Sequence, residues 1–590
     1  MCASTGHPDT TSTTAPMSSL LDDIDRKCNE LMEEAVRAKY LNVDLEHDLS
    51  IKVLVVNEQG SRRTISTFPI ETPGTTPKVH RRVFSTLATI VGENGLPNVT
   101  NVSIQMPRTF DEHNQTGTNE MTPFLQSIAD SSTIQRLQFS TNFPFVDDSS
   151  DGSADDSSDG SVDTAQSDII SQPTNMVPLV TALAANFTSP QSVLNKAYVF
   201  GMHFDDEMMT ILCEAISSRE SRLVSLELER FQFPTLGPFW AALAANKSIQ
   251  NVSVRYGAFV GTNVGDGLGI QQLQSMLETN TTMTEFEMAS GRPFPNSFFN
   301  SLGAGLASNA TLTTLDLFDG RAQEQDYLTA FFEGGLNRII GLEKLTLKLK
   351  DLSSTQQLVS GLERMANNVS VQRSTDGSHG VSPLKNLRLD FNFEESIMEC
   401  AKLVFDSLVR NSKWFAWEQL HFDCWSNNPD TEDVEFWNKL AAVIQACPGL
   451  TTFHMNVNKC PSDADLEGIA NSLENNTTIT WLEADGLRPT ADVQEENTWS
   501  LVDNPNRTRN ACSIARNIRE LPVFLNARKT SLLPSVLATL LKPRKSKVGQ
   551  VVNWTHAFHL VQNLPDLFST DGSGGGRGGG KTVLVCEQEE

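Results

Sequence analysis

A glycine-rich stretch near the carboxyl end of the sequence has the spacing of a phosphate-binding loop. Residues Gly575–Thr582 read Gly-x-x-x-x-Gly-Lys-Thr, in which backbone amides would surround phosphates and the lysine would reach the β- and γ-phosphates. That chemistry needs a buried strand before the loop, whereas Ser569–Ser573 reads Ser-Thr-Asp-Gly-Ser. We therefore expect residues 569–590 to be a flexible tail, with regulatory nucleotide binding as the alternative.

Two histidines and an aspartate form a second candidate site. His421 and Asp423 alternate within one short apolar segment, and His454 has the equivalent position in the next segment. Imidazole and carboxylate groups bind zinc, and histidine titrates near neutral pH. A metal or proton-sensing site is therefore the alternative here, but the sequence supplies no third strong ligand, and we predict no metal and no cofactor.

An acidic, serine-rich tract over residues 147–168 contains almost no apolar residue. It cannot offset the loss of chain entropy by burying surface, so we expect a disordered insertion. No part of it has the Asp-x-Asp-x-Asp-Gly spacing and final glutamate of a calcium loop. Its acidic serines suit an acidophilic kinase, and phosphorylation is the role we consider for it.

The composition excludes several classes of function. The ten histidines form no Ser-His-Asp, Cys-His or His-x-x-x-His pattern, so we predict that the protein is not an enzyme. The net charge of −26 disfavours contact with the phosphate backbone of nucleic acid. Without a run of about 18 apolar residues, we expect no membrane span.

The cysteines indicate a reducing compartment. There are nine, scattered and without a Cys-x-x-Cys pair, which fits neither a disulfide framework nor a zinc ribbon. Residues 1–16 are rich in Ser and Thr and lack the regions of a secretory signal. We predict a cytoplasmic protein, with the nucleus as the alternative because Lys542–Lys547 is basic.

One phrase recurs along the chain and predicts its architecture. Apolar residues stand at i, i+3 and i+5, often after an Asn, as in Asn309-Ala-Thr-Leu312-Thr-Thr-Leu315-Asp-Leu317. Many successive triads are roughly 29 residues apart, at the upper end of the leucine-rich-repeat range of ~20–29 residues. The triads begin at Val99, Ile134, Leu194, Leu223, Ile249, Met283, Leu312, Leu342, Leu384, Trp417, Leu450 and Ile479.

Each triad predicts a short strand, and a helix precedes it. Leu315 and Leu317 alternate as in a strand with one buried face, and Phe298–Ala307 has apolar residues at helical spacing. Such units bury their apolar faces only by stacking on neighbours. We therefore predict an α/β solenoid of about twelve strands, with a curved parallel sheet on the concave side and helices on the convex side.

Many Asn-x-Ser/Thr triplets have the form of glycosylation acceptors. Because no secretory signal precedes them, we expect no glycosylation. Asn246, Asn280 and Asn309 fall between helix and strand, where we expect left-handed backbone and hydrogen bonds to the turn. The triplets begin at Asn98, Asn186, Asn246, Asn280, Asn309, Asn368, Asn475 and Asn476.

These units resemble ribonuclease-inhibitor-like leucine-rich repeats, which read helix, then Asn-x-Thr/Ser-Leu-x-x-Leu-x-Leu. The resemblance covers roughly Val83 to Asp485, and Ala197, Val254 and Ala484 depart from leucine. Because members of that family are mostly protein-binding modules without catalysis, the resemblance implies a scaffold that binds a protein partner on its concave face.

The ends of a repeat array need caps. Leu20–Tyr40 has the pattern of an amphipathic helix, and Ile51–Val56 with Thr64–Phe68 reads as a hairpin. Dimerisation or partner docking is the alternative role of that helix. The predicted parts are a disordered terminus (1–18), a helix and hairpin cap (19–82), the solenoid with its insertion (83–485, with 147–168), a helical carboxyl-terminal cap (486–568) and a glycine-rich tail (569–590).

Alternate residues of each strand should point out of the concave face. Their charges run from acidic to basic and back to acidic along the array, which favours recognition of a protein. The predicted partner-binding residues are Glu227, Glu229, Arg255, Glu285, Glu287, Asp316, Lys344, Lys348, Arg388, Asp390, His421, Asp423, His454, Trp481, Glu483 and Asp485.

Overall fold

The computed structural model of the protein consists of strands and helices that alternate along the chain. The chain divides into two compact units, Met1–Thr431 with Met455–Asn458, and Glu432–His454 with Lys459–Glu590. The structure describes residues 17–45, 51–57, 62–68, 76–92, 96–106, 115–141, 176–256, 258–259, 269–290, 294–319, 327–335, 341–349, 351–376, 382–391, 397–424, 434–457, 468–469, 471–473, 476, 478–479 and 481–484.

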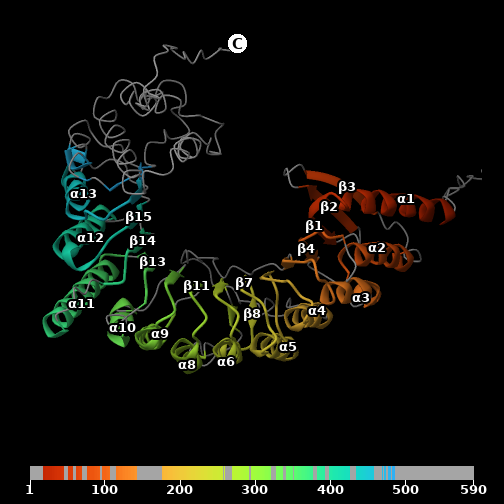
Figure 1. The fold of residues 1–590 in the computed structure, drawn as a ribbon, viewed down its shortest axis with the longest axis horizontal. Helices are drawn as coiled ribbons and strands as arrows, with labels where there is room; N and C mark the ends of the chain where they lie inside the picture. The colour runs from red at the N-terminus through yellow and green to blue at the C-terminus, as the bar shows by residue number, and fades with distance from the viewer. Residues whose placement is uncertain are drawn as a thin grey trace, which may run out of the picture. The chain divides into compact units, whose positions relative to one another are not determined.

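The first unit has two layers, with the strands on the inner side of its arc and the helices on the outer side (Figure 1). The predicted α/β solenoid is confirmed. Its parallel strands, in order across the sheet, are β4 (Asn101–Met106), β5 (Arg136–Thr141), β6 (Lys196–Phe200), β7 (Ser225–Glu229), β9 (Asn251–Arg255), β11 (Glu285–Ser290), β12 (Thr314–Asp319), β13 (Lys344–Leu349), β14 (Asn386–Phe391) and β15 (Gln419–Cys424).

The helices pack against the buried face of this sheet. They are α2 (Thr76–Val91), α3 (Gln115–Ala129), α4 (Val177–Thr188), α5 (Asp206–Ser217), α6 (Gly237–Ala245), α8 (Ile270–Thr279), α9 (Asn296–Ser308), α10 (Tyr327–Gly334), α11 (Leu352–Asp376) and α12 (Ile397–Asn411). Strands β8 (Gln232–Phe233) and β10 (Ala258–Phe259) form a separate short parallel pair.

The apolar triads produce the core because their register is constant. Leu315 on β12 lies opposite Leu345, which lies opposite Leu387 on β14. Each of these side chains is at most 1% exposed. A slip of one residue would turn the leucines to the other face, so the burial of one face holds the register across the sheet.

A ladder of asparagines links the ends of several helices to the end of the preceding helix. The side-chain amide of each Asn donates to a backbone carbonyl about one repeat earlier, and the side chains are at most 3% exposed. Helices leave their last carbonyls without intrahelical partners, and these bonds satisfy one of them. The pairs are Asn186 with Ile128, Asn246 with Ile216, Asn280 with Leu243, Asn309 with Leu277 and, within the second unit, Asn476 with Ile444.

The expected left-handed backbone at these asparagines is wrong. Asn246, Asn280 and Asn309 have φ of −66°, −75° and −87°, and all three are extended. The expected bonds to the turn are present, because Oδ1 of Asn309 accepts from the backbone N–H groups of Thr311 and Leu312. In the extended conformation, the side-chain amide of each Asn reaches the end of the preceding helix. Asn368 departs from the series, because it lies inside α11.

Two glycines let α9 pack closely between its neighbours. A Cβ at Gly303 would collide with the backbone oxygen of Phe331 in α10, and one at Gly305 would lie 2.7 Å from the side chain of Leu277 in α8. The small-residue segment Leu302–Leu306 thus sets the spacing of three successive helices.

The amino-terminal region contains a strand that the sequence pattern did not predict. Helix α1 (Met17–Ala35) ends before Tyr40, and β1 (Ala38–Leu45) begins within the range predicted as helix. Leu41 and Val43 alternate on its buried face, which is strand periodicity. Strand β1 pairs in parallel with β4 and antiparallel with β2 (Ile51–Asn57), which pairs antiparallel with β3 (Arg62–Phe68).

The second unit contains α13 (Val434–Ala446) and β17 (Trp481–Ala484). Strand β16 (Thr452–Val457) has its first three residues in the second unit and the rest in the first. The predicted insertion (147–168), helical cap (486–568) and tail (569–590) lie outside the described residues. Among the residues that are described, no helix has both the length and the apolar character to cross a membrane.

Candidate functional site

The side of the first unit's sheet that faces away from the helices, here called the open face, carries the polar strand residues. On β14 the burial alternates, with Asn386, Arg388 and Asp390 partly exposed and the leucines between them buried. Because the strands are parallel and in register, equivalent residues form rows across the sheet. The central row is Tyr198, Glu227, Ser253, Glu287, Asp316, Thr346, Arg388 and His421.

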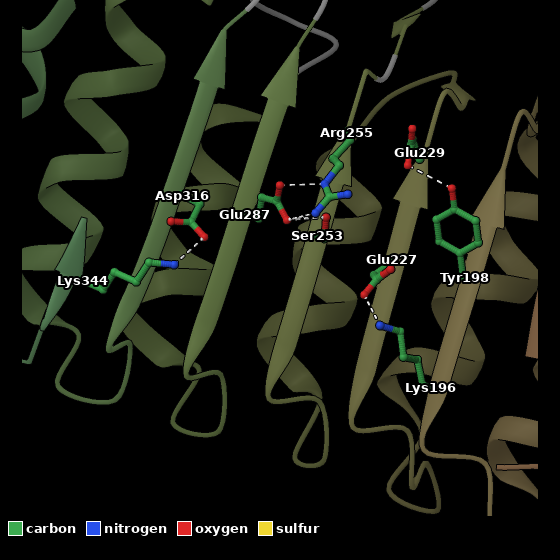
Figure 2. Close-up of polar contacts among 9 residues, drawn as sticks. All are labelled: Lys196, Tyr198, Glu227, Glu229, Ser253, Arg255, Glu287, Asp316 and Lys344. Atoms are coloured by element: carbon green, nitrogen blue, oxygen red, sulfur yellow. Dashed lines mark hydrogen bonds and ion pairs between the residues drawn. The ribbon is translucent and has the colours of Figure 1, made fainter. Parts of the chain in front are cut away.

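Most acidic side chains of the open face are already bound to a neighbouring strand (Figure 2). Lys196 forms an ion pair with Glu227, and the hydroxyl of Tyr198 donates to Glu229 over 2.9 Å. Each of these contacts runs diagonally, because Lys196 lies opposite Ser225 and Tyr198 lies opposite Glu227. Diagonal neighbours lie ~7–8 Å apart at Cα, within the reach of long side chains.

A bidentate contact joins β9 to β11 on this face (Figure 2). Arg255 donates through Nε and Nη2 to the two carboxylate oxygens of Glu287, each over 2.6 Å. Ser253 adds a third bond to the same carboxylate at 3.0 Å. The two parallel bonds fix the planes of both groups. Further along, Nζ of Lys344 lies 3.4 Å from Oδ2 of Asp316.

These contacts change the ionisation of two of the partners. Burial, together with the hydrogen bond to Glu229, raises the pKa of the Tyr198 hydroxyl, which therefore stays protonated and donates. The bond to Glu287 raises the pKa of the Arg255 guanidinium. Both shifts favour the protonation states that hold the strands together.

A second group of charges lies on β13 to β15. Nη2 of Arg388 is 3.0 Å from Oδ2 of Asp423, and Nε2 of His421 is 2.9 Å from the same oxygen. Lys348 lies opposite Asp390, which lies opposite Asp423. The carboxyl groups of Asp390 and Asp423 thus have different surroundings. Asp423 contacts both His421 and Arg388, whereas Asp390 lies on the strand between Lys348 and Asp423.

The two aspartates shift in opposite directions. Burial raises the pKa of the Asp390 carboxyl, and the charge of Asp423 adds to this. Burial alone would also raise the pKa of Asp423, but the hydrogen bond from His421 and the charges of His421 and Arg388 outweigh it and lower that pKa. The charged form of Asp423 is therefore favoured, and that of Asp390 is disfavoured.

The carboxyl ends of β7 and β9 are followed by residues with strained backbone. Arg230 and Tyr256 both have φ of 51°, which is uncommon for residues other than glycine. The guanidinium of Arg230 lies 5.4 Å from the centroid of the Phe200 ring, and Tyr256 is 43% exposed. The sequence analysis did not predict the backbone of Arg230 and Tyr256, since neither residue type indicates a positive φ.

The predicted partner-binding residues are placed as follows. Those on β7 to β15 lie on the open face, which brings Glu227, Glu229, Arg255, Glu287, Asp316, Lys344, Arg388 and Asp423 into cross-strand contacts. Glu285 lies on β11 at the end of the open face where the strands begin, and Lys348 and Asp390 lie opposite each other on β13 and β14. Sequence reasoning missed Lys196 and Tyr198, although both stand at outward positions of the weak triad that begins at Leu194.

Four predicted residues belong to the second unit by their position in the chain. His454 lies on β16, and Trp481 and Glu483 lie on β17, where their side chains are not described. Asp485 lies outside the described residues, as does Gly575–Thr582. Metal binding or proton sensing by His421 with His454, and nucleotide binding by the tail, therefore stay predictions.

Comparisons with known proteins add little to this description. No protein-family model matches the chain, and no curated protein matches it. One similar solved structure is described as the crystal structure of a Rad7 and Elc1 complex in yeast. That match has 16% sequence identity and a TM-score of 0.34, and it covers 63% of this chain and 72% of that chain.

Proposed function

We propose that the protein is a non-catalytic scaffold that binds another protein on the open face of its sheet. The observation that carries this proposal is the series of cross-strand contacts from β6 to β15, in which charged side chains are held in defined positions. Side chains that are ordered before binding lose less conformational entropy when a partner docks. A prearranged polar surface is therefore suited to selective recognition.

The size and charge pattern of the open face support the same function. Ten parallel strands at a spacing of ~4.8 Å extend over roughly 45 Å along the sheet, which accommodates a protein interface of standard size. The face carries both signs of charge, with Glu227 and Glu229 on β7 and Lys344, Lys348 and Arg388 further along the sheet on β13 and β14. Such a pattern rejects partners whose charges do not match.

Charge reversal tests the proposal. We expect the variant Lys344→Glu, Lys348→Glu, Arg388→Glu to lose a set of proteins that the full-length wild-type chain captures from native cells, as identified by quantitative mass spectrometry. The matched control reverses Arg364 and Arg410, which are 47% and 60% exposed on the helix layer. Circular dichroism would check that both variants fold. Capture of the same proteins by the open-face variant would refute the proposal.

A further inference from the structure

Three buried polar atoms on neighbouring strands of the central row lack a hydrogen-bond partner among the described residues. They are Oδ1 of Asp316 on β12, Oγ1 of Thr346 on β13 and Nε of Arg388 on β14. The three residues lie directly opposite one another in the sheet. Thr346 is 1% exposed, although it stands on the open face. Buried polar groups in folded proteins are nearly always paired, so three unpaired atoms in one row require an explanation.

Partly exposed charged side chains flank these atoms. Thr346 lies between Lys344 and Lys348 on the same face of β13. Lys344 is 42% exposed, and its Nζ lies 3.4 Å from Oδ2 of Asp316. Arg388 is 43% exposed and keeps its bond to Asp423 through Nη2, so Nε is left to donate elsewhere. A ligand that displaces the Lys344 side chain, which has a flexible four-carbon stem, would take its place beside Asp316 and Thr346.

The unpaired atoms define the chemistry of that ligand. Asp316 supplies an acceptor and needs an N–H group, Arg388 supplies a donor and needs an oxygen, and the Thr346 hydroxyl serves either role. Two strand spacings separate the ends of this set, which is roughly 10 Å. Three residues of extended peptide also cover about 10 Å, and such a segment presents N–H and C=O groups along one edge.

We infer that Asp316, Thr346 and Arg388 form a subsite that binds the main chain of an extended peptide segment lying across β12 to β14. This inference rests on the proposed function and names the part of the partner that this region recognises. Recognition through main-chain groups tolerates different side chains, whereas the surrounding charged pairs select among them. The peptide supplies hydrogen bonds that no described residue makes to these three atoms.

Thr346→Val tests the inference, because valine keeps the shape of threonine and removes the hydroxyl. A linear peptide library displayed on phage, selected on the full-length protein, should yield peptides that bind wild type about tenfold more tightly than Thr346→Val, the loss of one good hydrogen bond. The free Thr346→Val protein should melt at a higher temperature than wild type, because the variant no longer buries an unpaired hydroxyl. A purely structural role for the hydroxyl predicts a lower melting temperature.

Two controls separate this inference from the proposed function. Thr314→Val removes a hydroxyl from the open face of β12 outside the central row and should leave peptide affinity unchanged. N-methylation of the peptide amides should abolish binding, while alanine substitution of most peptide side chains should not. If no peptide is enriched, or if Thr346→Val binds it as tightly as wild type does, the inference is wrong. Capture of a folded protein that the Lys344, Lys348 and Arg388 reversal abolishes would still support the scaffold.

Discussion

Replacement of Asn309 by alanine should lower the free energy of unfolding more than replacement of an exposed asparagine does. Its Nδ2 donates to the carbonyl of Leu277 over 2.6 Å, and its Oδ1 accepts from the N–H groups of Thr311 and Leu312 over 2.9 and 2.7 Å. The residue is 3% exposed. Alanine therefore leaves three backbone groups without these partners, two of them at buried bonds and the N–H of Thr311 at a partly buried one.

The expected cost follows from these bonds. Each net hydrogen bond contributes about 1 kcal/mol, and a buried group left unpaired costs roughly 1–3 kcal/mol. Three bonds thus give a loss of about 3–5 kcal/mol in the free energy of unfolding. Asn98→Ala is the matched control, because Asn98 is exposed and donates one bond of 2.7 Å to the carbonyl of Val36. Its expected cost is about 1 kcal/mol or less.

Urea denaturation followed by circular dichroism measures both variants. Because units of a repeat array can unfold separately, hydrogen exchange at the amides of β11 and β12 should accompany it. We expect exchange in Asn309→Ala to accelerate on these strands and on the adjacent helices before it does so elsewhere. Equal denaturation midpoints for Asn309→Ala and Asn98→Ala would refute the ladder as a source of stability.

Three further predictions concern ionisation and helix packing. Folding raises the pKa of Asp390, so the charged form of this residue destabilises the fold at neutral pH. Asp390→Asn should therefore raise the melting temperature at pH 7. The gain should shrink as the pH falls toward the unfolded-state pKa of about 3.9. Folding lowers the pKa of Asp423, so Asp423→Asn should lower the melting temperature at pH 7. That loss should disappear as the pH falls below about 3.9, the unfolded-state pKa. Melting curves of both variants from pH 3 to 8 test this, and a change of the same sign in both would contradict it. Gly303→Ala should cost roughly 1–3 kcal/mol through its collision with Phe331, whereas Gly237→Ala, whose added Cβ meets nothing nearer than 3.7 Å, should change stability by about 0.5 kcal/mol or less in urea denaturation.

The repeat architecture could be predicted because its physical cause is periodic. Leu315 and Leu317 alternate in the sequence and are buried in the sheet, and the same spacing recurs on the neighbouring strands. The period of two also separates the open-face residues from the core. Where the pattern weakens, as at Leu41 and Val43 on β1, a helix pattern that ends nearby conceals the strand.

The contacts of the open face could not be predicted from that pattern. Whether Glu287 bonds Arg255 or stays free depends on strand stagger and side-chain rotamers, neither of which follows from residue spacing. The unpaired hydroxyl of Thr346 carries no sequence signal, because threonine is common on strands for its shape alone. The backbone of Arg230 and Tyr256 was missed for a related reason, since tertiary packing sets their positive φ.

In the asparagine ladder, each donor lies later in the chain than the helix whose carbonyl it bonds, which affects the order of folding during synthesis. The carbonyl of Leu277 at the end of α8 receives its partner from Asn309, which lies 32 residues later in the chain. During synthesis the helix is therefore made well before the side chain that completes its last turn. The ends of α3, α5, α6 and α8 therefore gain their asparagine partners only after the end of a later helix, α4, α6, α8 or α9, has been synthesised.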